Sequence, residues 1–309
     1  MKKAVAVKDL KKSYGELEAV KGISFSVNPG EIFGFLGPNG AGKTTTLRMM
    51  TGIFPPDEGE IYLAGHNLQK EPMLAKQNIG VAPELANAYH DLTALENVLF
   101  MANLYGLSGA RIKRRSQDLL ATFGLEDRMH DYVREFSKGM QQRVIICMAL
   151  VNDPEIIFLD EPTSGLDVES RQLIRDTILD LNRRGKTIFL TTHDIQEANR
   201  LCSRIGIINR GEIAAVDRPE KLKGTIAESQ SIKVSFNKQV EFDFKSWDLV
   251  SKVEEEGDKY RLYTDQPEEL IFTLTDIARE KGLKIQSLNT LGPSLEDVFV
   301  QLTGGNNCA

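Results

Sequence analysis

Residues 37–44 carry the clearest chemistry in this chain, because their sequence Gly-Pro-Asn-Gly-Ala-Gly-Lys-Thr fits the pattern G-x-x-x-x-G-K-[ST]. The largely apolar run 31–36 before them predicts a buried strand, and residues 45–50 after them predict the first turns of a helix. Glycines let successive backbone N–H groups face an anion, and a helix N-terminus adds partial positive charge. The pattern therefore predicts a phosphate-binding loop.

Two side chains at the end of this loop have definite tasks in such a site. Lys43 is expected to reach the β and γ phosphates of a nucleotide, and the Thr44 hydroxyl is expected to hold Mg²⁺. A glycine-rich turn that only connects a strand to a helix needs neither side chain. The favoured interpretation is therefore a site for a nucleotide with Mg²⁺.

A second apolar run, residues 156–159, ends in the two carboxylates Asp160 and Glu161. In a nucleotide site Asp160 can hold Mg²⁺, directly or through water, and Glu161 can polarise the attacking water. Acidic turn residues after a strand are common, so this pair alone does not decide the chemistry. The segments on either side of it narrow the choice.

The composition limits the class of protein. A length of 309 residues suggests two domains, and a net charge of −6 with a pI near 5.5 argues against a nucleic-acid binder with a basic face. The basic run 111–115 is interpreted as the solvated face of a helix. Cys147, Cys202 and Cys308 are odd in number and far apart, which indicates a reducing compartment without a disulfide framework. The longest apolar run, 144–151, is too short to span a bilayer, so any membrane role is expected to come through a partner.

Hydrophobic periodicity predicts an α/β fold. Alternation over residues 5–27 predicts an antiparallel meander of short strands, with turns at Tyr14-Gly15 and Lys21-Gly22. From residue 136 to residue 208 apolar strands alternate with amphipathic helices, which predicts a largely parallel sheet covered on both faces. A final hairpin is expected to close this domain near Val216.

Helical periodicity over residues 92–123, broken at 106–109, predicts a helical insertion. Alternating and helical patterns return after a polar, unpatterned stretch, which predicts a linker and a small α+β domain. The expected organisation is a nucleotide-binding domain over 1–220 with a helical subdomain at about 85–150, a linker over 221–230, and a small domain over 231–309.

Three further segments identify a family. They are Phe136-Ser137-Lys138-Gly139-Met140-Gln141-Gln142-Arg143, Pro162-Thr163-Ser164-Gly165-Leu166-Asp167 and Thr191-Thr192-His193-Asp194. In that order they resemble the signature segment, the D-loop and the switch histidine of the ATP-binding subunits of ABC transporters. Together with the phosphate-binding loop they cover most of residues 1 to about 220. The resemblance implies a P-loop NTPase fold of the ABC type, ATP and Mg²⁺ as cofactors, and ATP hydrolysis.

The resemblance also implies residue roles. The catalytic residues are Glu161, His193 and Lys43. The residues that bind ATP are Tyr14, Gly37, Pro38, Asn39, Gly40, Ala41, Gly42, Lys43, Thr44 and Thr45. The binding site for the ATP of a partner subunit is completed by Ser137, Lys138 and Gly139. The dimer D-loop is Ser164, Gly165, Leu166 and Asp167, and the Mg²⁺ ligands are Thr44, Asp160 and Glu84.

Two of these roles have a plain structural alternative. Ser137 stands at an expected helix start, where its hydroxyl suits an ordinary N-cap as well as a γ-phosphate. Tyr14 corresponds to the aromatic residue that stacks on adenine in the family, but half-buried tyrosines are also common in strands.

Two departures from the family pattern point to a narrower branch. The usual signature Leu-Ser-Gly-Gly-Gln is replaced here by residues 136–140, in which Lys138 adds a cation beside the expected phosphate. Glu84 stands where the family usually has a glutamine, and its charge is expected to make the site depend more on Mg²⁺. These features, with the C-terminal segment 294–304, resemble ABC-2-type exporter subunits that handle drugs, lipids or polysaccharides.

The resulting hypothesis is an ATPase subunit, peripheral at the cytoplasmic face of the membrane, that dimerises around two ATP molecules and drives an ABC-2-type permease for export. The second subunit is identical or paralogous, nucleic acid is not a partner, and the resemblance places the permease contact after Glu84, including residues 92–105. One alternative is a soluble non-transport ABC ATPase, for which no long coiled coil, duplicated domain or basic face is visible. The other is a regulatory ATP-binding module without turnover, which Glu161 and His193 disfavour.

Overall fold

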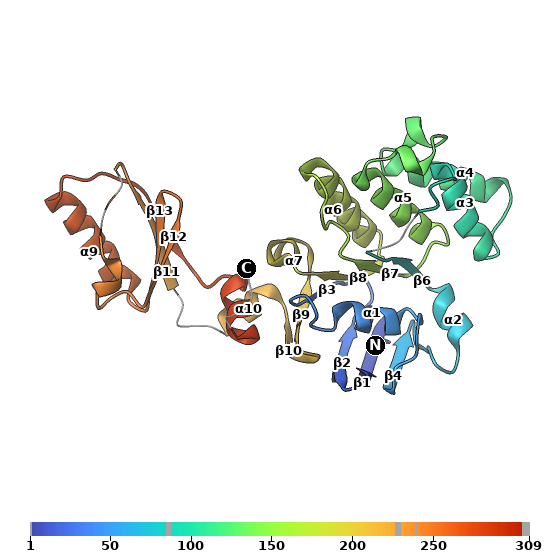
Figure 1. Cartoon of the computed structure of the whole chain (residues 1–309), viewed down its shortest axis with the longest axis horizontal. Helices are drawn as coiled ribbons and strands as arrows, with labels where there is room; N and C mark the ends of the chain where they lie inside the picture. The colour runs from blue at the N-terminus through green and yellow to red at the C-terminus, as the bar shows by residue number, and fades with distance from the viewer. Residues whose placement is uncertain (1, 85–87, 226–229, 239, 241, 305–309) are drawn as a thin grey trace. The chain divides into compact units, whose positions relative to one another are not determined.

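The computed structural model describes residues 2–84, 88–225, 230–238, 240 and 242–304 (Figure 1). The chain forms two compact units, Met1–Arg218 and Pro219–Ala309. The first unit contains the phosphate-binding loop and the two carboxylates that follow the apolar run 156–159.

A six-stranded sheet forms the centre of the first unit, in the order β10-β9-β3-β8-β7-β6. Five of its strands are parallel, and only β10 runs antiparallel to its neighbour. Their bounds are β3 (Ile32–Leu36), β6 (Ile79–Ala82), β7 (Ile156–Asp160), β8 (Thr187–Thr192), β9 (Arg204–Asn209) and β10 (Glu212–Asp217). Since these strands are parallel, the carboxyl ends of β3, β6, β7 and β8 meet at one edge of the sheet.

A second, antiparallel sheet has the order β2-β1-β4-β5. It comprises β1 (Val5–Tyr14), β2 (Leu17–Val27), β4 (Glu58–Leu63) and β5 (His66–Asn67). The expected meander of short strands is instead one long hairpin, and the turn predicted at Lys21-Gly22 is wrong. Gly22 lies inside β2 with φ +83°, where the register against β1 shifts. Glycine adopts this left-handed conformation easily, so the strand bulges without ending.

The core of the first unit lies between the two sheets. The rings of Phe25, Phe33, Phe35 and Phe189 stack on one another at centroid distances of 5.4–6.0 Å. Helix α1 (Lys43–Met50) buries its apolar side chains in the same cluster. Figure 1 shows α6 (Val168–Arg183) and α7 (Ile195–Leu201) on the opposite side of the central sheet. Both faces are therefore covered, as the apolar strand sequences predict.

The helical region contains α3 (Ala94–Leu104), α4 (Ala110–Thr122) and α5 (Lys138–Leu150), with α2 (Pro72–Gln77) before it and the short 3-10 helices Glu126–Arg128 and Val133–Glu135 within it. The break between α3 and α4 falls at 105–109, close to the predicted one. The interpretation of the basic run as a solvated face is wrong for Arg115. Its guanidinium donates to Val151 O and Leu150 O at 2.9 Å, which satisfies carbonyls at the end of α5.

The second unit is a four-stranded antiparallel sheet, in the order β12-β13-β11-β14, with α9 packed on it. Its elements are α8 (Pro219–Gly224), β11 (Gln230–Phe236), a 3-10 helix (Phe244–Ser246), β12 (Lys252–Glu256), β13 (Lys259–Thr264), α9 (Pro267–Glu280), β14 (Ile285–Leu291) and α10 (Leu295–Thr303). The predicted linker is thus partly helical, because Leu222 is buried and anchors α8. Residues 226–229 of that linker lie outside the described residues.

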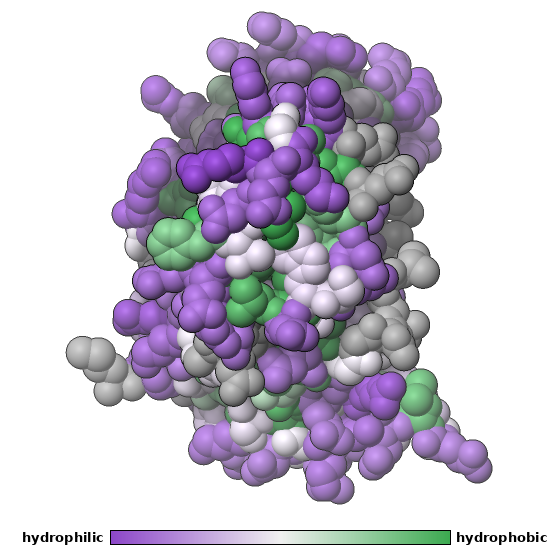
Figure 2. Space-filling view, turned by 90° about the vertical axis from the view of Figure 1, so that its left-hand side faces the viewer, coloured by the Kyte–Doolittle hydropathy of each residue, from purple (hydrophilic) through white to green (hydrophobic). Residues whose placement is uncertain are grey.

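Within the described residues, no helix is long and apolar enough to cross a membrane. The face in Figure 2 is mostly hydrophilic, with hydrophobic residues showing between the polar ones. Exposed apolar side chains include Met73, Leu104, Val168 and Phe272.

Candidate nucleotide site

One edge of the central sheet brings the candidate site residues together from separate parts of the chain. The phosphate-binding loop follows β3, His193 follows β8, and Asp160 ends β7 with Glu161 next to it. Because β8 lies between β3 and β7, His193 leaves the sheet between the loop and the two carboxylates. The sheet order therefore builds the site.

The glycines of the loop are required by close backbone contacts. Gly42 has φ +106°, and a Cβ at this position would lie 2.6 Å from Ala19 O. A Cβ on Gly37 would lie 2.5 Å from Ile208 O. Any larger residue at either position would displace the loop from β2 or β9. Contacts with β2 and β9 therefore fix the position of the loop. The loop continues directly into α1, whose N-cap is Gly42.

Lys43 is folded back into its own loop. Its Nζ donates to Gly37 O at 2.6 Å and to Pro38 O at 3.3 Å, and its side chain is 6% exposed. The same Nζ lies 3.5 Å from Glu161 Oε1, which forms an ion pair. The Lys43 ammonium is therefore held by two carbonyls of its own loop and by one carboxylate. Asn39 and Gly40 are exposed, whereas Ala41 is buried and Thr44 and Thr45 lie half-buried in the first turn of α1.

Glu161 stands in a strained backbone conformation. Its φ is +49°, which costs an ordinary residue about 1–2 kcal/mol. Its N–H donates to both Thr191 O at 3.2 Å and Thr191 Oγ1 at 3.1 Å, which stabilises this turn. The carboxylate then reaches His193, whose Nδ1 lies 2.8 Å from Glu161 Oε2. Such strain is typical of functional sites, where it aims a side chain.

Asp160 is 3% exposed and accepts a hydrogen bond from Thr191 Oγ1 at 2.5 Å. In the described part of the chain, no group of three or more His, Cys, Asp or Glu side chains could hold a metal by itself. The absence of such a cluster is compatible with Mg²⁺, because this ion usually binds through one or two protein oxygens together with phosphates and waters. Thr44 and Asp160 supply oxygens of the right kind for such a site.

Glu84 leaves the sheet beside Asp160. Strand β6 pairs with β7, with Ala82 opposite Leu159, so Pro83 and Glu84 follow at the same edge. The side chain of Glu84 is exposed. Its role as an Mg²⁺ ligand remains a prediction, and residues 85–87 lie outside the described residues.

The signature segment packs against the D-loop. Ser137 is the N-cap of α5 and accepts from Met140 N at 3.3 Å, so the N-cap interpretation holds. A Cβ on Gly165 would lie 2.4 Å from Lys138 Nζ, and one on Gly139 would lie 2.2 Å from Ser170 Oγ. Asp167 caps α6, and the hydrogen bond from Ser170 N holds the pKa of Asp167 below its usual range.

Tyr14 ends β1, and the residue is 49% exposed. It touches Phe54 edge-on at a centroid distance of 6.3 Å, and the ammonium of Lys12 lies 6.0 Å from the ring centroid. The half-buried alternative is therefore compatible with the structure, and stacking of Tyr14 on adenine stays a prediction.

Sequence reasoning did not identify the threonines that orient these carboxylates, nor Glu197 on α7. Glu197 is fully buried and accepts from Thr163 Oγ1 at 2.5 Å and Thr192 Oγ1 at 3.0 Å. The spacing of Asp194 and Glu197 suggests only a helix cap. The signal in the sequence that could have identified Glu197 is a glutamate on the buried face of a short helix.

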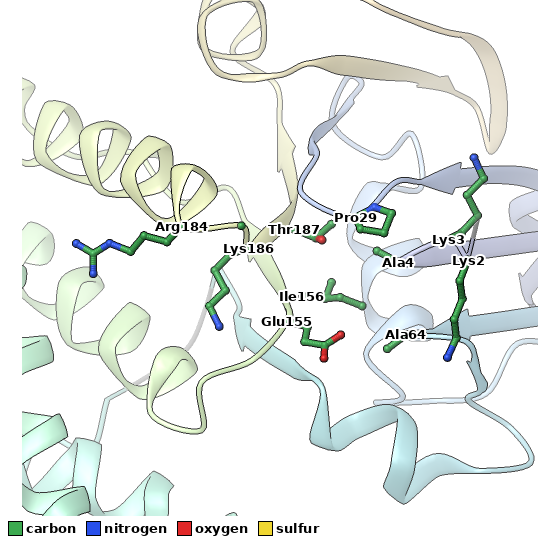
Figure 3. A pocket seen from close by; sticks show the side chains of 11 residues that line it. Lys2, Lys3, Ala4, Pro29, Ala64, Glu155, Ile156, Arg184, Lys186 and Thr187 are labelled. Carbon is green, nitrogen blue, oxygen red and sulfur yellow. The ribbon is translucent and has the colours of Figure 1, made fainter.

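A cavity of about 300 Å³ lies at the other edge of the sheet, where β7 and β8 begin, and is lined by Pro29, Ile156 and Thr187 among others (Figure 3). Figure 3 shows the charged ends of Lys3 and Arg184 pointing away from Ile156. Because the cavity lies where β7 and β8 begin and the candidate nucleotide site lies where they end, the two are separate.

Comparison with known proteins agrees with this geometry. The family model described as ABC transporter matches residues 20–164. The linearmycin resistance ATP-binding protein LnrL of Bacillus subtilis (strain 168) is 38% identical over 301 residues, which is 96% of this chain and 97% of that protein. The chain belongs to the ABC transporter family. The Nod factor export ATP-binding protein I of Rhizobium sp. (strain N33) is 39% identical, with 98% of each chain covered.

Solved structures confirm the fold of this ABC subunit. A structure of an ATP-binding subunit of an ABC transporter superposes with a TM-score of 0.67 at 32% identity, covering 72% of this chain and 93% of the other. A dimeric post-hydrolysis state of the ATP-binding cassette MJ0796, bound to ADP and Pi, has a TM-score of 0.64 at 32% identity, with 69% and 98% covered.

The chain is thus an ATP-binding, ATP-hydrolysing subunit of an exporter-type ABC transporter, with ATP and Mg²⁺ as cofactors. As such a subunit it dimerises, works with a membrane permease and associates peripherally with the transporter. The prediction of a P-loop NTPase of the ABC type is confirmed.

Proposed function

We propose that this subunit closes with a second copy or a paralogue around two Mg-ATP molecules, and that hydrolysis drives an ABC-2-type permease from the cytoplasmic face of the cell membrane. Relatives named for linearmycin resistance and Nod factor export align over nearly the whole chain, including the second unit. Lys138 and Glu84, which depart from the wider family pattern, support placement in the ABC-2 branch.

The observation that carries the catalytic assignment is the position of Glu161 between Lys43 and His193. One oxygen of Glu161 lies 3.5 Å from Lys43 Nζ and the other lies 2.8 Å from His193 Nδ1. When ATP binds, the Lys43 ammonium moves from loop carbonyls to the phosphate oxygens, and Glu161 is released to accept a proton from water. His193 then orients Glu161 and contacts the γ-phosphate.

The Mg²⁺ ion would supply positive charge that neutralises the phosphate oxygens as the γ-phosphoryl group leaves. Thr44 and Asp160 would hold it, because both lie at the sheet edge and offer oxygen atoms. Thr191 keeps the Asp160 carboxylate in a fixed orientation for this task.

The signature segment supports a composite site. Within one chain Lys138 lies against Gly165 of the D-loop, which the family places at the dimer interface, and Gly139 lies against Ser170 on α6. Ser137, Lys138 and Gly139 thus lie beside the D-loop, where a partner's ATP would meet the N-terminus of α5 and the Lys138 ammonium. In this proposal Leu166 and Asp167 also belong to the dimer interface.

Co-expression with a candidate permease tests the partner. The full chain is expected to sediment with membranes only when an ABC-2-type permease is present, and an unrelated membrane protein serves as control. Recovery of the chain in the supernatant despite the permease would contradict the proposed partner.

A surface variant locates the contact. Leu104 is 65% exposed on α3, in the region expected to meet the permease, and Leu104→Asp is expected to abolish sedimentation. Phe272→Asp, at a 69% exposed site on α9, is the matched control and is expected to leave sedimentation unchanged.

A further inference from the structure

The carboxylate of Glu197 is buried behind the catalytic edge, with 0% of the residue exposed. Its Oε1 accepts from Thr163 Oγ1 at 2.5 Å, and its Oε2 accepts from Thr192 Oγ1 at 3.0 Å. Arg175 Nε on α6 lies 3.5 Å from Oε1 and forms an ion pair with it. Burying a carboxylate is costly unless it is paired and hydrogen-bonded, and here both conditions are met.

The two threonines belong to the segments that carry the catalytic residues. Thr163 comes two residues after Glu161 and directly before the D-loop residues 164–167, and Thr192 comes directly before His193. The two segments are therefore joined twice. The front connection is the contact between Glu161 and His193 at 2.8 Å, and the rear connection runs from Thr163 through Glu197 to Thr192.

We propose that Glu197 is a positioning residue for ATP hydrolysis. By holding Thr163 and Thr192 together from behind, it fixes the distance and angle between Glu161 and His193. Because Thr163 leads into residues 164–167, the same connection links movement of the D-loop, on the partner side, to the position of His193. The proposal rests on the proposed roles of Glu161 and His193.

The carboxylate lets both threonine hydroxyls donate in this arrangement. Each of its oxygens accepts one hydroxyl, and its charge pairs with Arg175. Glutamine keeps the shape but has one acceptor oxygen, so one threonine hydroxyl loses its acceptor. A displacement of about 1 Å in a catalytic group lowers a rate by about 100-fold, so a small relaxation here is measurable.

The test compares Glu197→Gln and Thr163→Val with the wild-type full chain in ATP hydrolysis. We expect kcat to fall by about 10-fold to 100-fold while KM for ATP stays within about twofold, because the phosphate-binding loop is untouched. Thr163→Ser keeps the hydroxyl and is expected to retain wild-type kcat. A loss in Thr163→Ser equal to that in Thr163→Val would overturn the proposal.

Two matched controls separate positioning from general destabilisation. Glu31 is a buried glutamate paired with Arg204 at 3.2 Å, at the other edge of the sheet, and Thr177 is a buried threonine whose hydroxyl donates to Leu173 O of its own helix. Glu31→Gln and Thr177→Val are expected to lower the unfolding midpoint by a similar amount without a change in kcat. An equal loss of kcat in these controls would contradict a positioning role.

A double variant gives a readout that a purely structural role would not produce. Since Glu197 acts through Glu161, Glu161→Gln with Glu197→Gln is expected to hydrolyse ATP within about twofold of Glu161→Gln alone. A further loss by the full factor of the single Glu197→Gln variant would refute the proposal. If Glu161→Gln itself left turnover unchanged, the catalytic assignment of Glu161 would fail instead, which is a distinct outcome.

Discussion

Glu161 Oε2 lies 2.8 Å from His193 Nδ1, although the two residues are 32 positions apart in the chain. The contact exists because β7 and β8 are neighbouring parallel strands with Asp160 opposite Thr191. The segments that follow the two strands therefore leave the sheet side by side at the same edge. On its other side Glu161 pairs with Lys43. The carboxylate proposed to activate water thus contacts Lys43 through one oxygen and His193 through the other.

Lys43→Ala is expected to lower ATP hydrolysis by at least about 100-fold, because it removes the cation that the phosphates require. Phosphate release under saturating ATP measures this effect. Lys70→Ala, at a side chain that is 75% exposed, is the control and is expected to retain wild-type turnover. Unchanged turnover in Lys43→Ala would contradict the assignment of the loop.

Glu161→Gln is expected to trap a dimer with ATP bound, because closure needs the phosphates whereas water activation needs the carboxylate. We expect turnover to fall by about 100-fold to 10,000-fold. Size-exclusion chromatography with ATP and Mg²⁺ should show a dimer that disappears when the nucleotide is removed. A monomer under all conditions would rule out the closed-dimer hypothesis.

Glu84→Gln is expected to relax the magnesium requirement. Glu84 follows β6 at the same edge of the sheet as Asp160, so its negative charge is expected to disfavour nucleotide when no cation is present. The ratio of ATP affinity in Mg²⁺ to that in EDTA should therefore shrink by about threefold to tenfold. Identical magnesium titrations for the variant and the wild type would refute this account of Glu84.

Acid unfolding of the second unit is expected to depend on Asp297. Burial by itself raises the pKa of Asp297, but hydrogen bonds from Ser294 and the charge of Arg261 outweigh it, and the pKa in the folded state is lowered. A lowered pKa contributes stability above the unfolded value of about 3.9, and this stability is lost as the pH falls through the folded value. Asp297→Asn should therefore flatten the decline in stability below about pH 4.

Tryptophan fluorescence measures this effect selectively. Trp247 is the single tryptophan of the chain, and it packs against Phe244 in the core of the second unit. Thermal unfolding followed at this residue from neutral to acid pH gives the profile. Asp258→Asn, in the exposed turn between β12 and β13, is the control, and an equal flattening there would show that the effect is not specific to Asp297.

The sequence alone predicted most elements of the fold, because apolar runs bounded by glycines and acids mark buried parallel strands. It could not predict that residues 221–224 belong to a helix, since the short polar segment owes its stability to the burial of Leu222. Nor could it distinguish a turn from a bulge at Gly22, because one glycine permits both conformations.

The sequence determined the chemistry of this protein, since the residues of the phosphate-binding loop, Asp160, Glu161 and His193 are recognisable by type and spacing. The tertiary structure decided how these groups meet. Strand order places β8 between β3 and β7, and so brings His193 and the phosphate-binding loop to the edge where Glu161 contacts Lys43 through one oxygen and His193 through the other. The tertiary structure also shows that Glu197, which the sequence suggests only as a helix-cap residue, is buried and accepts hydrogen bonds from Thr163 and Thr192. The sequence could not predict this, because the partners of a buried carboxylate depend on how the helices and strands pack.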